Sequence, residues 1–335
     1  MAGKKNKQAF LYILPCILIL GIFVYYPLIM NMVYSTQSFT LSATTKEFVG
    51  LANFSKLFSD KIILTCLKNN ILYAVISVII QVGFGLVLAA VLEDKLLQKF
   101  SPFFRTTFFI PTLLSMTVVC LLFEFIYNPQ MGLLNSFLEL IGLDNLTNIW
   151  LGKSKIAMFA VIAVSQWQST GYVTMLFIVA IQKIPRDLYE AAEMDGAGKI
   201  RQFLSITVPQ VRQMFFVTMV ITVVGAFTVF NEPYILTGGG PGTSTMTLAL
   251  HMYQTGVVKN DMGYASTIAI LIFVITAVLS SIQFFHYRRK GGRITHEEKI
   301  KASQMGYWRI CMVHCSGYPC YYDYLSYVLD YHVLL

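Results

Sequence analysis

Six long, nearly uncharged apolar runs constrain this sequence more than any other feature. Each has about 20 residues or more, which at 1.5 Å per residue lets an α-helix cross roughly 30 Å of hydrocarbon. The runs cover residues 10–34, 71–92, 107–127, 156–181, 215–236 and 265–287. Glu124 and Glu232 are the only acidic residues within them, and each lies near one end of its run. The pattern predicts an all-α membrane protein with six transmembrane helices.

The composition excludes an ordinary soluble protein. Of the 335 residues, 56% are hydrophobic and 13% are charged, whereas about 25% of residues are charged in a typical soluble domain. A soluble chain with a mean hydropathy of +0.62 would expose large apolar patches, so we expect the hydrophobic residues to face lipid. The net charge of +8 is typical of membrane topology and contact with anionic lipid. The chain has no basic tract long enough to predict a nucleic-acid partner.

The basic residues beside the ends of the six runs predict an orientation. With a cytoplasmic N-terminus, 15 Lys and Arg residues fall on the inner side and 7 on the outer side. Because cytoplasmic loops carry the excess of basic residues, this distribution predicts that both termini are cytoplasmic. Lys4, Lys5 and Lys7 precede the first run as in a signal peptide. The run is long and lacks a small-x-small cleavage site, however, which favours an uncleaved first helix.

The inner loop at residues 182–214 has the pattern of a helical hairpin. Pro185 suits a first helical position, and Asp187 and Glu190 lie where the helix dipole favours acidic side chains. Gly196 follows at the point where a helix end often needs the left-handed conformation that glycine adopts at low cost. The spacing therefore predicts a first helix that ends at Gly196.

A second amphipathic stretch completes the predicted hairpin and stops at Pro209. Its apolar positions are Ile200, Phe203, Leu204 and Ile206. The pattern alone leaves two alternatives open: the hairpin binds a partner protein, or the hairpin is a passive re-entry turn. On the outer side, residues 35–70 and 128–155 mix polar and apolar residues well enough to form small helical caps.

The hairpin contains a string with a familiar spacing. It consists of Glu190, Ala191, Ala192, three residues, Gly196, nine residues, Ile206, Thr207, Val208 and Pro209. This string resembles the EAA loop of binding-protein-dependent ABC importer permeases, in which Leu usually stands at the position of Val208. Three further stretches resemble the carbohydrate branch of that family. They are residues 48–60 (FVGLANFSKLFSD), residues 165–172 with the pair Ile184 and Pro185, and residues 236–242 (LTGGGPG).

The resemblance covers about residues 8–293 and implies a type I permease (MetI-like) architecture with a cytoplasmic EAA hairpin. In the family, this hairpin docks into a cleft on an ATPase subunit, where the glutamate of the motif meets basic groups through charge-assisted hydrogen bonds. Small residues after the glutamate allow close approach, and the glycine sets the elbow. The residues implied in ATPase coupling are Glu190, Ala191, Ala192, Asp195, Gly196, Ile206 and Pro209. The alternative for Glu190 is a merely solvated acid.

The resemblance implies the permease subunit of an ATP-driven ABC importer in the bacterial plasma (inner) membrane. Its implied partners are a second homologous permease subunit, two cytoplasmic ATPase subunits, an extracellular solute-binding protein and membrane lipid. The implied cargo is a sugar or oligosaccharide that the solute-binding protein delivers. We expect no cofactor and no metal ion on this chain, because ATP and Mg²⁺ would bind to the ATPase subunits.

The chain lacks a phosphate-binding loop of its own, so we expect a non-catalytic subunit. Such a loop needs Gly, four residues, Gly-Lys and Ser or Thr. The nearest string, Gly152, Lys153 and Ser154, has Thr147 where the first glycine belongs. The glycine-rich residues 238–242 could also suggest a phosphate cradle, but they are predicted to face outward. A backbone turn, or a docking surface on the face that a solute-binding protein approaches in the family, is favoured there.

Neutral polar and aromatic residues gather in the middle of the fourth run, at a depth where polar groups need partners. Such side chains can exchange hydrogen bonds with sugar hydroxyls while an aromatic ring covers the apolar face of a pyranose. They can also form interhelical hydrogen bonds worth about 0.6 kcal/mol each. The family has transport contacts on its fourth and fifth helices. The resemblance therefore favours as substrate-pathway residues Gln166, Trp167, Ser169, Tyr172, Asn231 and Tyr234.

An ion-coupled secondary carrier or channel for a small polar solute is the alternative function. Proton-driven carriers normally keep an acid, a histidine or a charge pair at mid-membrane, and the centres of the six runs contain none. An intramembrane enzyme would need a metal site or a nucleophile, and the sequence has neither an HExxH string nor paired catalytic carboxylates. Dependence of uptake on an ATPase and a binding protein separates the importer from the carrier.

Three segments are predicted along the chain. Residues 1–70 hold the first transmembrane helix and an outer loop, residues 71–293 form the permease core, and residues 294–335 form an atypical tail, disordered or artefactual. We interpret the tail as out-of-frame read-through or a gene-end artefact, because its composition changes abruptly to Cys, His and Tyr without a helical period. A metal site is disfavoured, since no usual zinc spacing matches Cys311, His314, Cys315 and Cys320.

Overall fold

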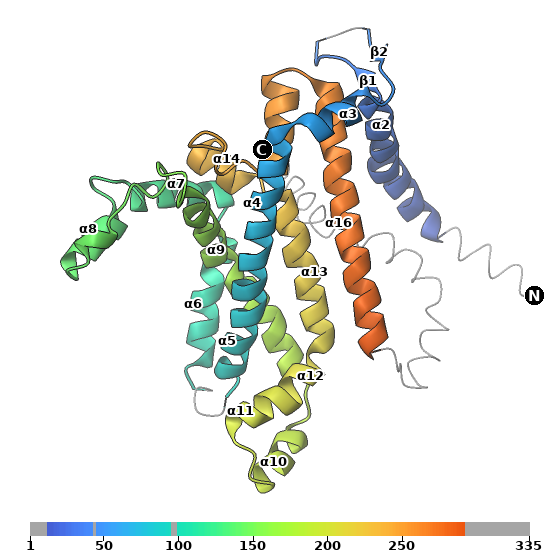
Figure 1. Ribbon diagram of the computed structural model, residues 1–335. Helices are drawn as coiled ribbons and strands as arrows, with labels where there is room; N and C mark the ends of the chain where they lie inside the picture. The colour runs from blue at the N-terminus through green and yellow to red at the C-terminus, as the bar shows by residue number, and fades with distance from the viewer. Residues whose placement is uncertain (1–11, 43–44, 95–98, 292–335) are drawn as a thin grey trace, which may run out of the picture. The chain divides into compact units, whose positions relative to one another are not determined.

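The computed structural model describes residues 12–42, 45–94 and 99–291, which form two compact units (Figure 1). The first unit draws on residues 1–64 and 248–274, and the second on residues 65–247 and 275–335. The first unit thus joins an N-terminal segment to a segment that the predicted boundaries assigned to the permease core. The predictions for the tail, including its cysteines and histidines, fall outside the described residues.

The first unit begins with the first predicted span, which is helical over Tyr12–Ser35. The span includes a π-helical turn, η1 (Gly21–Tyr25), and continues as α2 (Tyr26–Ser35). The predicted helical cap is present as α3 (Ala52–Ser59), beside two short antiparallel strands in which Gln37 pairs with Phe48. The remaining elements are β1 (Gln37–Ser38), β2 (Glu47–Phe48), α15 (Leu248–Tyr253), η5 (Gln254–Val258) and the first part of α16 (Met262–Gly291).

A half-buried carboxylate ties the elements of the first unit together. Asp60 Oδ2 accepts hydrogen bonds from His251 Nε2 at 3.0 Å and from the Tyr264 hydroxyl at 2.8 Å, and Asp60 Oδ1 accepts one from the Ile62 amide at 2.8 Å. Burial alone would raise the pKa of Asp60, but these hydrogen bonds outweigh it and hold that pKa below its usual value. Burial also lowers the pKa of His251, despite the nearby carboxylate. The cluster is therefore a neutral imidazole and a phenol bound to one ionised acid.

The second unit is built around a long helix that covers the second predicted span. It runs over Lys61–Leu92 as α4 (Lys61–Ser77), π-helical η2 (Val78–Phe84) and α5 (Gly85–Leu92). The prediction began this helix ten residues late, because it required an uncharged run and Lys68 interrupts that run. Lysine is a good helix former, so the helix continues through Lys68 to Lys61.

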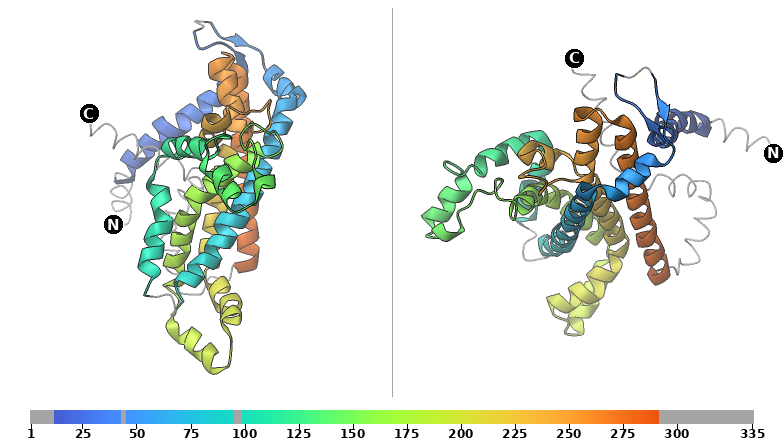
Figure 2. Two further views of the ribbon diagram at one scale, coloured as in Figure 1. Left: turned by 90° about the vertical axis from the view of Figure 1, so that its left-hand side faces the viewer. Right: turned by 45° about the horizontal axis from the view of Figure 1, so that its top comes forward.

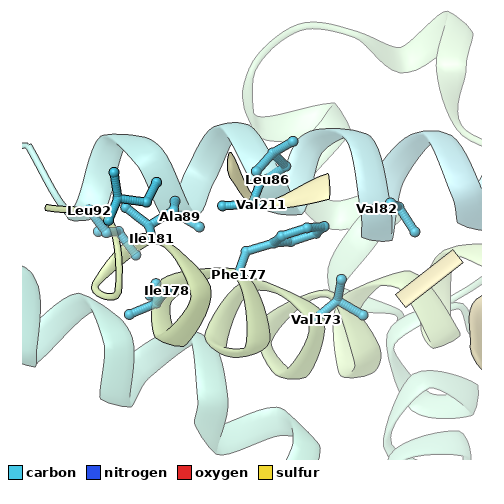
Figure 3. Close-up of a cluster of buried hydrophobic side chains, with 10 residues drawn as sticks. Val82, Leu86, Ala89, Leu92, Val173, Phe177, Ile178, Ile181 and Val211 are labelled. Atoms are coloured by element: carbon cyan, nitrogen blue, oxygen red, sulfur yellow. The ribbon is translucent and has the colours of Figure 1, made fainter. Parts of the chain in front are cut away.

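The helix of the fourth predicted span is present as α9 (Ala157–Ile181), which packs along α5. Their contact buries a cluster of apolar side chains (Figure 3), with Leu86 and Ala89 of α5 facing Phe177 and Ile178 of α9. Burial of such side chains is the main stabilising contribution of this interface. The whole cluster consists of Val82, Leu86, Ala89, Leu92, Val173, Phe177, Ile178, Ile181, Ile184 and Val211.

The third predicted span is wrong as a single helix. It forms α6 (Ser101–Leu113) and α7 (Met116–Ile126), which meet at a bend of 98°. Pro111 lacks the N–H of a regular helix, and one side chain of α9 satisfies the Leu114 carbonyl at the break, while Thr112 of α6 bonds to the backbone of α9. Gln168 Nε2 donates to the Leu114 carbonyl at 2.8 Å, and Thr112 Oγ1 donates to the Gln168 carbonyl at 2.8 Å. A side chain from the neighbouring helix thus makes the break tolerable in an apolar setting.

The fifth predicted span also divides. Its helix α13 (Arg212–Thr228) ends eight residues before the predicted end at 236, and a short helix, α14 (Asn231–Thr237), follows. The backbone at Val229 is extended, with ψ of 126°, which interrupts the helical hydrogen bonds. The predicted second cap is present as α8 (Leu133–Leu140) and a 3₁₀ turn, η3 (Asp144–Leu146).

The fold is helical and membrane-spanning as predicted, but the count of six spans is not reproduced. Among the described residues, three helices are long and apolar enough to cross a membrane, and five spans result if each of two bent pairs is counted as one. The helix α9 has 25 residues yet is not among them, because its central polar residues lower its mean hydropathy. The three helices are Tyr12–Ser35, Lys61–Leu92 and Met262–Arg288.

Candidate functional site

The predicted hairpin is present at one end of the second unit (Figures 1 and 2). Its first helix is α10 (Arg186–Met194), with Pro185 as the N-cap residue rather than the first helical residue, and Asp187 in the first turn. Gly196 has φ of +77°, so the left-handed elbow predicted for this glycine is confirmed. Its amide donates to the Glu193 carbonyl at 3.0 Å and closes the helix end.

The sequence predicted that the second arm of the hairpin stops at Pro209, but the helical arm continues past this residue. It runs through α11 (Lys199–Gln202), π-helical η4 (Phe203–Thr207) and α12 (Val208–Gln210) and then bends by 72° into α13. Pro209 lies in the first turn after the π-helical segment, where a missing N–H costs least. The proline therefore continues this arm, and the chain turns at Val211 instead.

One face of the hairpin is anchored to the buried cluster between α5 and α9. Tyr189 of α10 and Phe203 and Ile206 of η4 pack against that cluster. The Tyr189 hydroxyl also lies 2.9 Å from Thr207 Oγ1, which joins the two arms. Ile206, one of the predicted coupling residues, thus acts as an anchor within this chain.

The opposite face of the hairpin is open. The helix α10 has no buried residue, and Met194, Ile200 and Leu204 are 88%, 78% and 59% exposed. Large apolar side chains gathered on a projecting element mark an interaction surface. The predicted coupling residues on this open part of the hairpin are Glu190, Ala191, Asp195, Gly196 and Pro209, which are exposed, and Ala192, which is half-buried.

Two acids just beyond the end of the long helix connect it to the hairpin and to α6. Asp94 Oδ2 pairs with Lys199 Nζ at 3.0 Å. Glu93 pairs with Arg105 of α6 and accepts a hydrogen bond from Gln182 Nε2 at 3.3 Å. Burial raises the pKa of Glu93 although the guanidinium of Arg105 opposes this shift. These residues line a cavity of about 910 Å³ between the long helix, α6 and the hairpin.

The polar residues of α9 have different surroundings. Gln166 is buried, and its Nε2 donates to Ser77 Oγ of α4 at 3.0 Å. This is an interhelical hydrogen bond, which was the alternative to a substrate contact for the polar residues of this helix. Ser169 is half-buried. Trp167 and Tyr172 are 43% and 40% exposed, and Trp167 packs edge-on against Phe123 of α7 with ring centroids 5.4 Å apart.

The two predicted pathway residues of the fifth span lie on α14, which packs against α7 and α9. Asn231 is exposed, and Tyr234 is 44% exposed and stacks on Phe230 with ring centroids 5.0 Å apart. Half-exposed aromatic rings on adjoining helices can cover the apolar face of a sugar ring. Whether these residues contact a substrate stays a prediction.

Sequence analysis missed a set of polar residues on one turn of α4. Asn70 binds the last turn of α13, and Asn69 and Tyr73 bind two parts of the segment that follows α13. Their signal was available, because two consecutive asparagines interrupt an otherwise apolar stretch. Gln168 is one of the polar residues in the middle of the fourth run, and its role at the break between α6 and α7 depends on Leu114, which lies 54 residues earlier in the chain.

Comparison with known proteins agrees with this architecture. The sequence profile of the family "binding-protein-dependent transport system inner membrane component" matches residues 81–291. The chain is 54% identical over 288 residues to the probable ABC transporter permease protein YurN of Bacillus subtilis (strain 168), covering 86% of this chain and 98% of that protein. It is 32% identical over 287 residues to the sulfoquinovosyl glycerol transport system permease protein SmoG of Agrobacterium fabrum (strain C58), covering 84% and 91% of the two chains.

A solved structure shows the same fold. The chain superposes with a TM-score of 0.75 on a subunit of a bacterial alginate ABC transporter in complex with alginate pentasaccharide-bound periplasmic protein. The two share 22% sequence identity, and the match covers 85% of this chain and 96% of that subunit. Together with the exposed hairpin and the membrane-spanning helices, these matches show that the chain is a multi-pass membrane protein of the family of binding-protein-dependent transport system inner membrane components, the permease subunits of ABC importers.

Proposed function

We propose that this permease carries a sugar or oligosaccharide and that its hairpin, residues 186–210, receives the ATPase subunits. The observation that carries the coupling role is the hairpin itself, whose inner face is anchored and whose outer face exposes Glu190 beside large apolar side chains. Only Asp187 lies in the first turn of α10, so Glu190 does not have the predicted place near the helix N-terminus, but its exposed carboxylate can still form charge-assisted hydrogen bonds with a basic cleft. The surrounding apolar surface adds area that is buried on docking.

The sugar cargo is supported by the relatives and by the site. Relatives include a sulfoquinovosyl glycerol permease and arabinooligosaccharide permeases. In this chain, Trp167, Tyr172 and Tyr234 offer partly exposed aromatic rings, and Asn231 and Ser169 add hydrogen-bonding groups near them in the sequence. We propose that these residues line the pathway and that Gln166 supports it from inside.

The proposed assembly pairs this chain with a second homologous permease subunit, two ATPase subunits on the cytoplasmic side and an extracellular solute-binding protein. The hairpin and both termini would then be cytoplasmic, and α14 would face outward. ATP and Mg²⁺ would bind to the ATPase subunits, while this chain supplies the path and the mechanical connection. Rigid-body rotation of the ATPase subunits would reach the helices through the anchored residues Tyr189, Phe203 and Ile206.

Glu190→Lys tests the coupling role in the complete importer reconstituted into lipid vesicles. We expect the variant to insert normally but to bind the ATPase subunits at least about 10-fold more weakly, because loss of a charge-assisted hydrogen bond is typically worth about 1.5 kcal/mol or more. Glu139→Lys, the same charge reversal on exposed α8, is the matched control and should bind normally. Unchanged ATPase binding and unchanged uptake in Glu190→Lys would contradict the proposal.

A further inference from the structure

One turn of α4 holds the last turn of α13 at one point and the segment between α13 and α15 at two points. Asn70 Nδ2 donates to the Ala226 carbonyl at the end of α13 at 2.7 Å. The Tyr73 hydroxyl donates to Glu232 Oε1 of α14 at 2.9 Å. Asn69 Nδ2 donates to the carbonyls of Ser244 and Met246 at 3.0 and 2.8 Å. We call Asn69, Asn70, Tyr73 and Glu232 the α4 clasp.

The clasp contains a buried acid that the predicted substrate path does not use. Glu232 is 6% exposed and Tyr73 is 3% exposed, and the Ser165 hydroxyl of α9 also hydrogen-bonds to the carboxyl group. Burial of an acid is costly unless its oxygens are hydrogen-bonded. Removal of the tyrosine hydroxyl would therefore leave a carboxyl group with an incomplete set of partners in the core.

The segment held by the clasp is internally rigid. The amide of Gly239 donates to the Pro233 carbonyl at 3.2 Å, so the glycine-rich turn folds back on α14. Thr245 Oγ1 lies 2.7 Å from Thr237 Oγ1 and donates to the Gly240 carbonyl at 2.9 Å. A force applied to the turn at residues 238–242 therefore moves α14 as a unit and is borne by the clasp.

The other end of the same long helix meets the hairpin. From Asn69 to Leu92 the helix extends for about 35 Å, and Asp94, two residues beyond its end, pairs with Lys199. Between these ends, buried polar side chains keep the helix in register with its neighbours, since Ser77 bonds to Gln166 of α9 and Gln81 lies 3.5 Å from Thr222 of α13. The buried polar positions 70, 73, 77 and 81 recur every three or four residues and so share one face of the helix.

We propose that the α4 clasp is a positioning device that transmits contact of the solute-binding protein with residues 231–246 along α4, η2 and α5 to the hairpin. This inference rests on the proposed function, because it takes the hairpin as the ATPase connection, and it takes the glycine-rich turn as the docking surface that the family resemblance implies. Rigid elements that are bonded at both ends are the physical means by which two distant sites can be coupled. The clasp acts by position, and its carboxyl group serves as a hydrogen-bond acceptor.

Tyr73→Phe is the decisive variant, since it removes one hydroxyl and leaves the ring in place. It is tested in the complete importer in lipid vesicles, by the rate of ATP hydrolysis with and without the substrate-loaded binding protein. We expect stimulation by the binding protein to fall about 10-fold, a typical size for coupling between sites, while assembly and unstimulated hydrolysis stay unchanged. Tyr127→Phe is the matched control, because it also removes one buried hydroxyl bond, to the Ala160 carbonyl at 3.2 Å, outside the clasp.

Two variants of Glu232 separate position from charge. Glu232→Ala should lose stimulation as Tyr73→Phe does, whereas Glu232→Gln should keep most of it, because an amide oxygen still accepts the tyrosine hydroxyl bond. Normal stimulation in Tyr73→Phe, an equal loss in Tyr127→Phe, or an equal loss in Glu232→Gln and Glu232→Ala would each overturn the clasp. If Glu232→Ala does not assemble, the comparison of Tyr73→Phe with Tyr127→Phe alone tests the role of the α4 clasp.

The result is separable from the test of the proposed function. If Glu190→Lys weakens ATPase binding but Tyr73→Phe is stimulated normally, the clasp fails and the importer stands. If Glu190→Lys binds the ATPase subunits normally, the proposed coupling fails, and the clasp as a route to the hairpin fails with it.

Discussion

Two short helices of the second unit, α10 and α14, are held in opposite ways. The helix α10 has no buried residue and lies in a hairpin with exposed apolar side chains. The helix α14 buries Glu232, Pro233 and Leu236 and is bonded to α4 and α9. An open apolar surface calls for a partner from outside the chain. The buried polar and apolar groups of α14 already have partners within the chain. A movement of α14 is therefore transmitted to the helices that it contacts.

The difference extends to how each region is connected. The hairpin is linked to the long helix by the solvent-exposed pair of Lys199 and Asp94 and by apolar packing. The segment after α13 is linked to the same helix by the buried hydrogen bonds of the α4 clasp. Apolar packing and exposed ion pairs permit small rotations, whereas buried hydrogen bonds demand fixed geometry. We therefore expect the connection between the long helix and the hairpin to be flexible, and the connection between the long helix and α14 to be rigid.

The largest expected effect is on the free energy of unfolding, when the same apolar volume is removed from α14 and from the hairpin. Leu236 is 7% exposed and packs with Val119, Val161 and Val164. Leu236→Ala should lower the free energy of unfolding by about 2 to 4 kcal/mol, because it leaves a cavity in the core. Ile200→Ala, at a side chain that is 78% exposed, should change it by less than about 0.5 kcal/mol.

Unfolding of the two variants can be followed by denaturant titration in detergent, alongside binding of the ATPase subunits. We expect Ile200→Ala to weaken that binding while Leu236→Ala lowers stability. Equal losses of stability in the two variants would show that the hairpin is as tightly packed as α14 and would contradict the proposed difference between them.

The sequence predicted well those features that depend on neighbouring residues. The helical period and the glycine elbow at Gly196 follow from local chemistry, and the structure confirms both. Errors of one residue at Pro185 and of ten residues at Lys61 arise because composition alone does not fix where a helix begins.

Features that depend on distant residues were not predictable in this way. The break after Leu113 is stabilised by Gln168, and the clasp joins Tyr73 to Glu232, 159 residues later in the chain. A run of apolar residues contains no information about such pairings. The polar residues were visible in the sequence, but whether Gln166 faces a substrate or Ser77 depends on the packing of α9 against α4.

A smaller effect is expected at the hairpin elbow. Gly196 has φ of +77° and open space around the position of a Cβ atom, so Gly196→Ala should cost only the conformational strain of about 1 to 2 kcal/mol. Gly198→Ala is the matched control, because Gly198 has φ of −68° and equally open space. Hydrogen exchange of the hairpin amides should rise in Gly196→Ala alone. Equal exchange in both variants would show that the elbow does not need the left-handed conformation.

The smallest effect is expected for the ion pair between Lys199 and Asp94, whose side chains are 59% and 24% exposed. A double-mutant cycle of Lys199→Met and Asp94→Asn, measured by hydrogen exchange of the hairpin, should give a coupling free energy below about 1 kcal/mol. The coupling should vanish in about 1 M salt, where the screening length is only about 3 Å. A coupling of several kcal/mol that survives salt would make the hairpin as stiff as α14. A weak, salt-sensitive coupling would instead mean that the hairpin can turn on its packed anchor, as a joint between a moving ATPase and a rigid helix must.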